Sequence, residues 1–424
     1  EINYLSLRLV GKAALTVSIG QILFTFAFGL LIGLAFNFPL NQAAFIAIAL
    51  AFSSTAIVVK FLSEKGDLRT LYGRISIGIL LVQDIVVLAL LIVLPGLGAA
   101  GKLGFYEVAA NAVKGLIGIV AILLVGRSVL PAFLNKISRN RELLFLFSLS
   151  WVFLIAMFME AIGFSIAIGG FLAGLALANS VQSFEIGGRI KPLRDFFIII
   201  FFIMLGSSLV FVGAKALLAP LVVFSLFVLL GNPLIVIVLM SLFHYKKRTG
   251  FLTGITIAQV SEFSFILAAL GLRLGQISEG VAALITTVGI VTITTSTYMI
   301  LHAEKIFHLL SPVLSQFERK RAKSEVSAVA PQKPIVLIGC HRVGQSIAFG
   351  LPKEKVLVVD CDPDIVKNLG LHGFDCLFGD IADPEIYNQA GIGNARMVIS
   401  TSPHLHDNLA LISYAKSGLN RPKI

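Results

Sequence analysis

Residues 13–59 read AALTVSIGQILFTFAFGLLIGLAFNFPLNQAAFIAIALAFSSTAIVV, a run without a single charged side chain. A helix that crosses a bilayer needs about 20 mostly apolar residues, so the run can supply two such helices. The hydroxyl triplet Ser53-Ser54-Thr55 interrupts its second half. Hydroxyl side chains can support a local break in a helix, and they also occur bonded back to the backbone of an intact one. The run therefore predicts membrane-spanning helices, one of which is a candidate for interruption.

The whole chain divides into an apolar part and a polar tail. Of its 424 residues, 57% are hydrophobic and 13% are charged, and the mean hydropathy is +0.93. Soluble domains carry about 25% charged residues. From Glu318 onward, however, the chain reads like an ordinary soluble protein. This excludes a wholly water-soluble fold and predicts one part in lipid and one in water.

The distribution of basic residues tests the number of spans and their orientation. Loops rich in Lys and Arg alternate with loops that hold little basic charge, so by the positive-inside rule every second loop, both ends of the chain and the tail are cytoplasmic. The ten predicted spans are residues 14–36, 43–62, 73–95, 106–126, 143–160, 164–181, 195–212, 216–243, 251–271 and 279–301. The basic loops contain Lys60, Lys65, Arg69, Arg74, Arg127, Lys136, Arg139, Arg141, Arg189, Lys191, Arg194, Lys246, Lys247, Arg248, Arg319, Lys320 and Arg321.

Net charge and cysteines narrow the possible partners. The net charge is +11, but the basic residues form short clusters between apolar runs instead of one basic face, so we expect no nucleic-acid partner. Cys340, Cys361 and Cys376 all lie in the tail, in no metal-ligand spacing, which predicts reduced thiols. The chain begins with Glu instead of Met, and we expect it to be a fragment of a longer protein.

Two carboxylates lie deep inside predicted spans, where an ionised side chain costs at least about 2.5 to 3.5 kcal/mol. Asp84 is about twelve residues into the third span, and Glu262 is similarly deep in the ninth. A structural carboxylate, hydrogen-bonded to a neighbouring helix, is one interpretation of Asp84. Because no basic residue lies nearby at membrane depth, an ion or proton site is favoured. For Glu262, capping the backbone of an interrupted helix is an equally good interpretation.

A faint internal repeat supports interruption of both helices. A shift of about 208 residues lays Val260-Ser261-Glu262 over Phe52-Ser53-Ser54, and the spans that follow, near residues 73 and 279, then coincide as well. Paired interrupted helices in corresponding positions of two halves indicate a substrate site near the midplane. Asp84, one span after the first break, lies where such a site is expected.

Five motifs, in this order and spacing, resemble a known family. Together they are similar to the second family of monovalent cation:proton antiporters, especially the Kef-type potassium/proton branch with a C-terminal potassium-conductance regulatory domain (RCK, or TrkA-N). The resemblance implies crossed, interrupted helices from inverted repeats, a bacterial inner-membrane location, a homodimer, and two or three N-terminal helices absent here. The motifs are Ala51-Phe52-Ser53-Ser54-Thr55-Ala56, Gln83-Asp84, Gly169-Gly170-Phe171-Leu172-Ala173-Gly174, Phe201-Phe202-Ile203 with Gly206, and Gln259-Val260-Ser261-Glu262-Phe263.

The resemblance also implies roles for single residues. Asp84 matches the carboxylate that binds either the cation or the proton, and Gln83 stands where sodium-selective relatives often have a second aspartate. The Gln-Asp pair looks like the potassium-type pattern. The residues matching the two crossing helices, which complete the expected ion site, are Ser53, Ser54, Thr55, Gln259, Ser261 and Glu262.

The chain departs from the family at two positions. Many relatives have a lysine in the helix at 216–243 as partner to the binding aspartate, whereas this chain has Gly231-Asn232-Pro233 there. Asn232 can only form hydrogen bonds, so it cannot form the anchoring ion pair. The acidic loop of glutathione-gated members is also replaced, by Phe184-Glu185-Ile186-Gly187-Gly188-Arg189-Ile190-Lys191-Pro192, and glutathione gating is not expected.

The tail contains a β-α-β pattern. A linker-like stretch, 312–333, leads into the apolar strand 334–338, a turn into a helix, and a second strand, 355–360. Asp360 follows Gly339 by about 20 positions, the spacing at which a carboxylate can meet a ribose hydroxyl. His341 stands where a complete fingerprint has glycine, so a Rossmann-like fold that binds no nucleotide is the alternative. The expected nucleotide residues are Gly339, His341, Arg342, Gly344, Asp360 and Asp380.

The sequence thus predicts a polytopic all-α membrane domain, 1–311, joined by the linker to a partial α/β RCK domain, 334–424. We expect a secondary transporter that exchanges potassium for protons, with NAD(H) or an adenine nucleotide regulating it from the tail. Sodium/proton exchange is the first alternative. An RCK-gated channel is less favoured because no carbonyl-filter motif is present. An NAD-dependent enzyme on a membrane anchor would not need ten spans.

Overall fold

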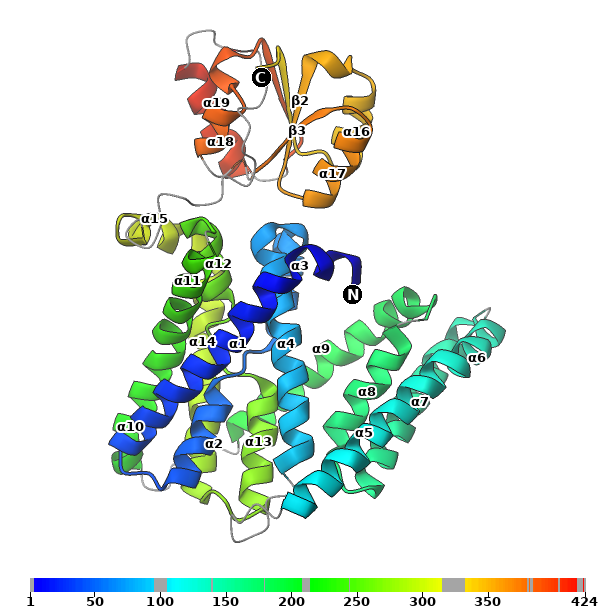
Figure 1. Ribbon diagram of the computed structural model, residues 1–424, viewed down its shortest axis with the longest axis vertical. Coiled ribbons are helices and arrows are strands. Elements are labelled where there is room, and N and C mark those ends of the chain that lie inside the picture. Colours follow the sequence, from blue (N-terminus) through cyan, green and yellow to red (C-terminus); the bar gives the residue numbers. More distant parts are fainter. Residues whose placement is uncertain are drawn as a thin grey trace. The chain divides into compact units, whose positions relative to one another are not determined.

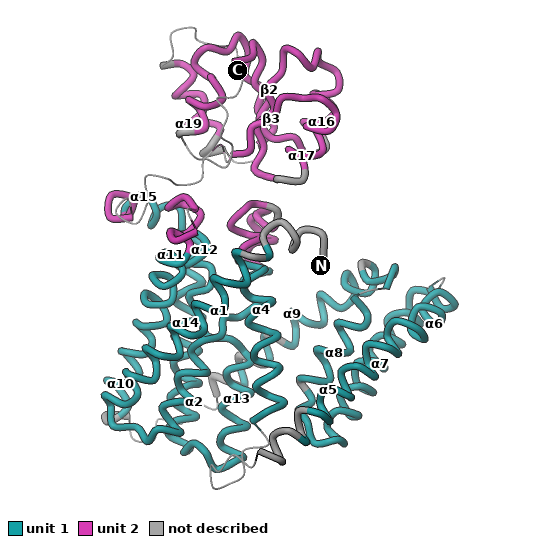
Figure 2. The backbone as a smooth tube through the Cα atoms, viewed as in Figure 1, with its two compact units in different colours: residues 1–59, 76–239, 251–309 teal, residues 60–75, 240–250, 310–424 magenta. Residues whose placement is uncertain are grey.

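The computed structural model describes residues 4–94, 105–138, 140–178, 180–207, 214–243, 245–314, 332–379, 381, 384–402, 405–417 and 422. The chain forms two compact units, one of residues 1–59, 76–239 and 251–309, the other of residues 60–75, 240–250 and 310–424 (Figure 2). The first unit is helical. The second contains helices and a four-stranded sheet.

Helices lie over all ten segments that the hydropathy pattern predicts as spans (Figure 1). The segments at 43–62 and 251–271 are each composed of two helices in succession, and the segment at 216–243 contains two helices joined by the π-helical turn Phe227–Gly231. The helices are α1 (Tyr4–Ala35), α2 (Leu40–Leu50), α3 (Thr55–Lys65), α4 (Leu71–Val93), α5 (Phe105–Ser128), α6 (Leu130–Ile137), α7 (Arg141–Ala161), α8 (Ile166–Ala178), α9 (Ser183–Ser207), α10 (Ala214–Leu226), α11 (Asn232–Leu242), α12 (Lys247–Thr256), α13 (Glu262–Arg273), α14 (Glu279–Leu301) and α15 (Ala303–Leu314).

Several of these helices can cross a membrane. Among the described residues, six helical segments are long and apolar enough, or seven if the pair Val113–Ser128 and Leu130–Ile137, bent by 42°, forms one span. Large apolar side chains also remain exposed on helix surfaces, as Phe153, Leu154 and Met157 do on α7, which is the pattern that lipid-facing surfaces need. The protein is a multi-pass membrane protein, and the total of ten spans stays a prediction.

Two of the helical segments are interrupted, as the hydroxyl triplet and the repeat predict. Between α2 and α3 the chain leaves the helix at residues 51–54, and between α12 and α13 it does so at residues 257–261. The predicted fold, with crossed interrupted helices, is confirmed. Small residues let α1 pack closely on α2, because a Cβ added at Gly33 would lie 2.9 Å from the Cβ of Ala43.

The C-terminal part is a parallel α/β fold. Four strands, in the order β3-β2-β1-β4, pair in parallel. Alternate residues of β1 and β2 enter two separate buried clusters, one shared with α16 and α17 and the other with α18 and α19, so helices cover both faces (Figure 1). The elements are β1 (Ile335–Ile338), α16 (Arg342–Phe349), β2 (Val356–Asp360), α17 (Pro363–Leu371), β3 (Asp375–Phe378), α18 (Pro384–Gln389), β4 (Met397–Ser400) and α19 (Leu405–Ser417).

This arrangement confirms the α/β fold expected for the tail. The predicted linker, 312–333, falls largely on residues 315–331, which lie outside the described residues, and α15 ends just before them at Leu314. The domain boundaries at 311 and 334 stay predictions.

Candidate functional site

The two interrupted helices cross at their breaks. The backbone N–H of Ser261 donates to the carbonyl of Phe52 at 2.9 Å, and the hydroxyl of Ser53 donates to the carbonyl of Ile257 at 2.7 Å. One unwound segment therefore satisfies backbone groups of the other, which compensates for the helical hydrogen bonds that each break removes.

Hydroxyl side chains also restart the two helices. Ser54 accepts a hydrogen bond from the N–H of Ile57 at the beginning of α3. Ser261 is the N-cap of α13 and accepts from the N–H of Phe263 at 3.2 Å. Serine is a favoured N-cap because its oxygen pairs with an N–H that has no partner within the helix. Two helix N-termini, with their partial positive charge, consequently begin at the crossing.

Asp84 lies beside the first of these helix N-termini. Its side chain, on α4, is 6% exposed, and its Oδ2 accepts a hydrogen bond from the hydroxyl of Thr55 at 3.0 Å. Thr55 is the first residue of α3. Among the described residues, Thr55 is the only hydrogen-bond donor to Asp84. The carboxylate thus keeps acceptor capacity that the protein does not use.

Glu262 lies beside the second N-terminus. It is the first residue of α13, is partly exposed, and is close enough to Asp84 for the two carboxylates to interact electrostatically. The structure therefore brings two acidic groups to the crossing, each beside the N-terminus of a helix whose dipole favours negative charge. A site with two carboxylates and nearby carbonyl and hydroxyl oxygens suits a hard cation or a proton.

Gln83 and Asn232 are held in a buried hydrogen-bond network. The Oε1 of Gln83 accepts from the N–H of Ser53 at 3.0 Å, and the Nδ2 of Asn232 donates to the carbonyl of Leu50 at 3.3 Å. Asn232 directly follows a π-helical turn, Phe227–Gly231, a widened turn often found at functional sites. Gln83 therefore contacts the first break, and Asn232 contacts the end of α2 next to it.

Two members of this network were not expected from the sequence. Gln21 and Thr25 of α1 connect Gln83 to Asn232. A signal for them does exist in the charge-free run, since the two polar residues are four positions apart and therefore share one helix face. Gln259, by contrast, pairs with the hydroxyl of Ser296 on α14 at 2.8 Å, and its Nε2 is buried without a hydrogen-bond partner in the described part of the chain.

The glycine-rich turn of the tail is built as a strand-to-helix connection. Gly339 has φ +78°, a left-handed conformation that glycine adopts readily. A Cβ at Gly344 would clash with the carbonyl oxygen of Gly339, so glycine lets α16 approach β1. His341 is the exposed N-cap of α16 and makes no capping hydrogen bond with its side chain. Arg342 begins α16, and Asp380 lies outside the described residues.

Asp360, at the end of β2, is bound by backbone on both sides. One carboxylate oxygen accepts from the N–H of Cys340 and the other from the N–H of Asp362. Burial raises the pKa of the Asp360 carboxyl above its ordinary value, while these two N–H donors lower it. The carboxylate thereby ties the β1–α16 turn to the end of β2, and each oxygen retains a further lone pair for a ribose hydroxyl.

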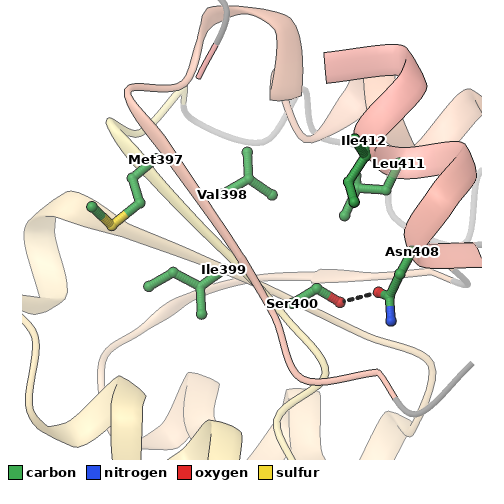
Figure 3. A pocket seen from close by; sticks show the side chains of 7 residues that line it. All are labelled: Met397, Val398, Ile399, Ser400, Asn408, Leu411 and Ile412. Carbon is green, nitrogen blue, oxygen red and sulfur yellow. Dashed lines mark hydrogen bonds between the residues drawn. The ribbon is translucent and has the colours of Figure 1, made fainter. Parts of the chain in front are cut away.

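A separate cavity of about 440 Å³ lies in the tail between β4 and α19. Figure 3 shows its lining, which includes Met397, Ile399 and Leu411, and the hydrogen bond from the Ser400 hydroxyl to Asn408 at 2.6 Å. Among the described residues that line it, none is an expected nucleotide residue. The cavity is therefore distinct from the glycine turn.

Comparisons with known proteins agree with both parts of this description. Residues 1–302 match the family described as sodium/hydrogen exchanger, transmembrane, and residues 335–424 match the TrkA-N domain. The chain is 29% identical over 387 residues to the glutathione-regulated potassium-efflux system protein KefC of Escherichia fergusonii, covering 88% of this chain and 60% of that protein. It is 28% identical over 418 residues to the K(+) efflux antiporter 1, chloroplastic, of Arabidopsis thaliana, covering 93% of this chain and 34% of that protein.

The chain thus spans 60% of the first relative and 34% of the second. The resemblance that the sequence motifs carry is confirmed, because one family model covers the helical part and another the tail. Since the first match extends over more than half of the 424 residues, the chain belongs to the sodium/hydrogen exchanger family, a family of membrane transporters and not of enzymes, and carries a TrkA-N domain behind its transmembrane part.

Proposed function

We propose that the protein exchanges potassium for protons across the membrane by alternating access, with Asp84 as the group that binds one or the other. The observation that carries the proposal is the buried Asp84 carboxylate at the crossing of two broken helices, with Thr55 as its only hydrogen-bond donor among the described residues. A carboxylate without a cationic partner inside a membrane protein needs a proton or a bound cation to neutralise it.

This requirement couples the two fluxes. With a proton or with potassium bound, Asp84 is neutral overall, and the site can change the side of the membrane that it faces. The empty, ionised site cannot do so easily, because an unneutralised charge at membrane depth costs several kcal/mol, about 2.5 or more. One titrating group then gives one-for-one exchange as the simplest stoichiometry.

Potassium is the proposed cation and sodium the alternative. Gln83 offers a neutral amide where a second carboxylate would strengthen the field at the site and favour the smaller ion, which is harder to dehydrate. The two relatives described above are named for potassium efflux, which supports the same choice. We further propose a homodimer in the bacterial inner membrane with the tail in the cytoplasm, as the basic loops favour.

The tail is the proposed regulatory part. Its glycine turn at the N-terminus of α16 offers backbone N–H groups to a phosphate, and Asp360 is the candidate partner of a ribose hydroxyl. We propose NAD(H) or an adenine nucleotide as the regulatory ligand, held by Gly339, His341, Arg342, Gly344, Asp360 and Asp380.

Ion flux in vesicles tests the transport proposal. The full chain is reconstituted into liposomes that carry an internal pH dye, and outward gradients of potassium, sodium or lithium chloride are applied in turn, with protein-free liposomes as the control. We expect proton uptake that depends on the cation gradient and is fastest with potassium. Equal or faster uptake with sodium would support the sodium/proton alternative, and no cation-dependent uptake at all would refute the antiport proposal.

A further inference from the structure

Four buried side chains form one continuous hydrogen-bond chain around the first break. The N–H of Ser53 donates to Gln83, whose Nε2 donates to the Oε1 of Gln21 at 2.6 Å. The Nε2 of Gln21 donates to the hydroxyl oxygen of Thr25 at 3.0 Å. That hydroxyl donates to Asn232 at 2.8 Å, and Asn232 donates to the carbonyl of Leu50.

The hydrogen bonds of this chain all run in one direction. They begin at the N–H of Ser53, inside the break, and end at the carbonyl of Leu50, the last residue of α2. The side chains of Gln21, Thr25, Gln83 and Asn232 are at most 1% exposed, so bulk water does not reach these hydrogen bonds. Gln21 also donates to the carbonyl of Ala51 at 3.3 Å, which pairs a further backbone group of the break.

We infer that Gln21 and Thr25 are positioning residues for the cation site, acting through Gln83 and Asn232. The inference rests on the proposed function. Gln83 and Asp84 are neighbours on α4, and Ser53 precedes Thr55, the donor to Asp84, by two residues. Holding the N–H of Ser53 on Gln83 therefore sets the distance between Thr55 and Asp84, and with it the geometry that the cation meets.

The same geometry defines what Gln83 does. Both ends of its amide are used within the protein, one by Ser53 and the other by Gln21. Its influence on the choice of cation then comes from fixing the break beside Asp84 and not only from lending an oxygen to the ion. Three different helices, α1, α4 and α11, contribute to one function, the positioning of the unwound segment.

Thr25 offers the sharpest test because its hydroxyl can be removed with little change of shape. Thr25→Val deletes the link between Gln21 and Asn232, and Thr25→Ser restores it. Ser18→Ala is the matched control, since Ser18 is also on α1, is buried, and donates to α4 through the carbonyl of Ile79, but makes no hydrogen bond to the break among the described residues. Gln21→Met, which removes the same link from its other end, is used if Thr25→Val fails to fold.

The first readout is potassium-driven proton uptake by each full-length variant in liposomes, normalised to folded protein from size-exclusion chromatography. We expect Thr25→Val to raise the KM for potassium about tenfold, because buried donors and acceptors lose their partners, with maximal velocity within about twofold of wild type. Thr25→Ser and Ser18→Ala should keep the wild-type KM. A Thr25→Val protein with wild-type KM would overturn the inference.

The second readout needs no transport. Hydrogen–deuterium exchange of peptides covering residues 50–55 should become about tenfold faster in Thr25→Val and not in Ser18→Ala, because the Ser53 N–H loses the support of the chain. If wild type transports nothing, the proposed function fails, and this readout still decides whether Thr25 holds the break. Unchanged exchange would overturn the inference. Faster exchange with an unchanged KM would also overturn it, because the hydrogen-bond chain would then have only a structural role.

Discussion

Two buried carboxylates, Asp84 in the helical unit and Asp360 in the sheet of the tail, are surrounded in opposite ways. Asp360 gives one oxygen to each of two backbone N–H groups, whereas Asp84 is bound by one side-chain hydroxyl. Backbone donors cannot move away without a change in the fold, but a hydroxyl can rotate. The comparison indicates that Asp360 holds a turn of the fold whether or not it also binds a ligand, while the partner of Asp84 can be exchanged.

The largest expected effect follows from neutralising Asp84. Asp84→Asn keeps the shape and the acceptor for Thr55 but cannot change charge, so cation-driven proton uptake should fall below detection, by about a hundredfold or more, with folding intact. Ser76→Ala is the control on the same helix, because the Ser76 hydroxyl is buried without a hydrogen-bond partner in the described part of the chain. Unchanged coupled uptake in Asp84→Asn would contradict the role of Asp84.

Asp360 should instead respond in stability. Asp360→Ala leaves the N–H groups of Cys340 and Asp362 without their acceptor, at about 1 to 3 kcal/mol for each. We expect faster hydrogen–deuterium exchange in peptides covering 335–345 and 358–364 of the full chain, with no change in peptides of α7. Exchange at the wild-type rate would show that the two backbone bonds contribute little.

The raised pKa of Asp360 gives this stability effect a pH dependence. A carboxyl whose pKa is higher in the folded than in the unfolded state binds more protons when folded, so its contribution to stability falls as pH rises from about 4 through the folded pKa. The stability of wild type relative to Asp360→Asn, measured by the same exchange experiment, should therefore be greater at low pH than at neutral pH. A stability difference between wild type and Asp360→Asn that grows with pH would contradict the direction of the pKa shift.

Glu262 should have an intermediate effect on transport. Glu262→Gln removes a negative charge within electrostatic range of Asp84, which should raise the KM for the cation by about tenfold or less without abolishing exchange. Glu279→Gln is a closely matched control, because Glu279 is also the first residue of a helix with a serine N-cap, Ser278, but is exposed at the start of α14. Complete loss in Glu262→Gln would make Glu262 as central as Asp84.

The smallest effect concerns the glycine turn of the tail. A side chain at His341 should obstruct a phosphate at the N-terminus of α16, so His341→Gly should tighten binding of NAD, NADH, AMP or ATP severalfold at both pH 6 and pH 8. Calorimetric titration of the full chain measures this. Weaker binding by His341→Gly would instead indicate that the imidazole attracts the phosphate. If wild type binds no nucleotide at millimolar concentration, the nucleotide proposal for the tail is wrong.

The sequence predicts the interruptions and the two acidic residues for a simple physical reason. A carboxylate or a hydroxyl triplet in an apolar run is conspicuous, because lipid disfavours it unless a local structure satisfies it. The sequence does not reveal the roles of Gln21 and Thr25, because single neutral polar residues occur in many helices and their partner Asn232 lies far away in the chain. Likewise, the spacing of Asp360 from Gly339 predicts proximity, but the two backbone bonds of its carboxylate depend on the folded turn.

The hydrogen-bond chain at the α2–α3 break has a consequence for speed. Its links are all groups of the protein, so the unwound segment has its shape before any ion arrives. A preorganised site does not lose conformational entropy each time it is filled. For the proposed cation site, we then expect shedding water from the incoming ion to be the main barrier to loading, so that turnover follows how readily each alkali ion dehydrates.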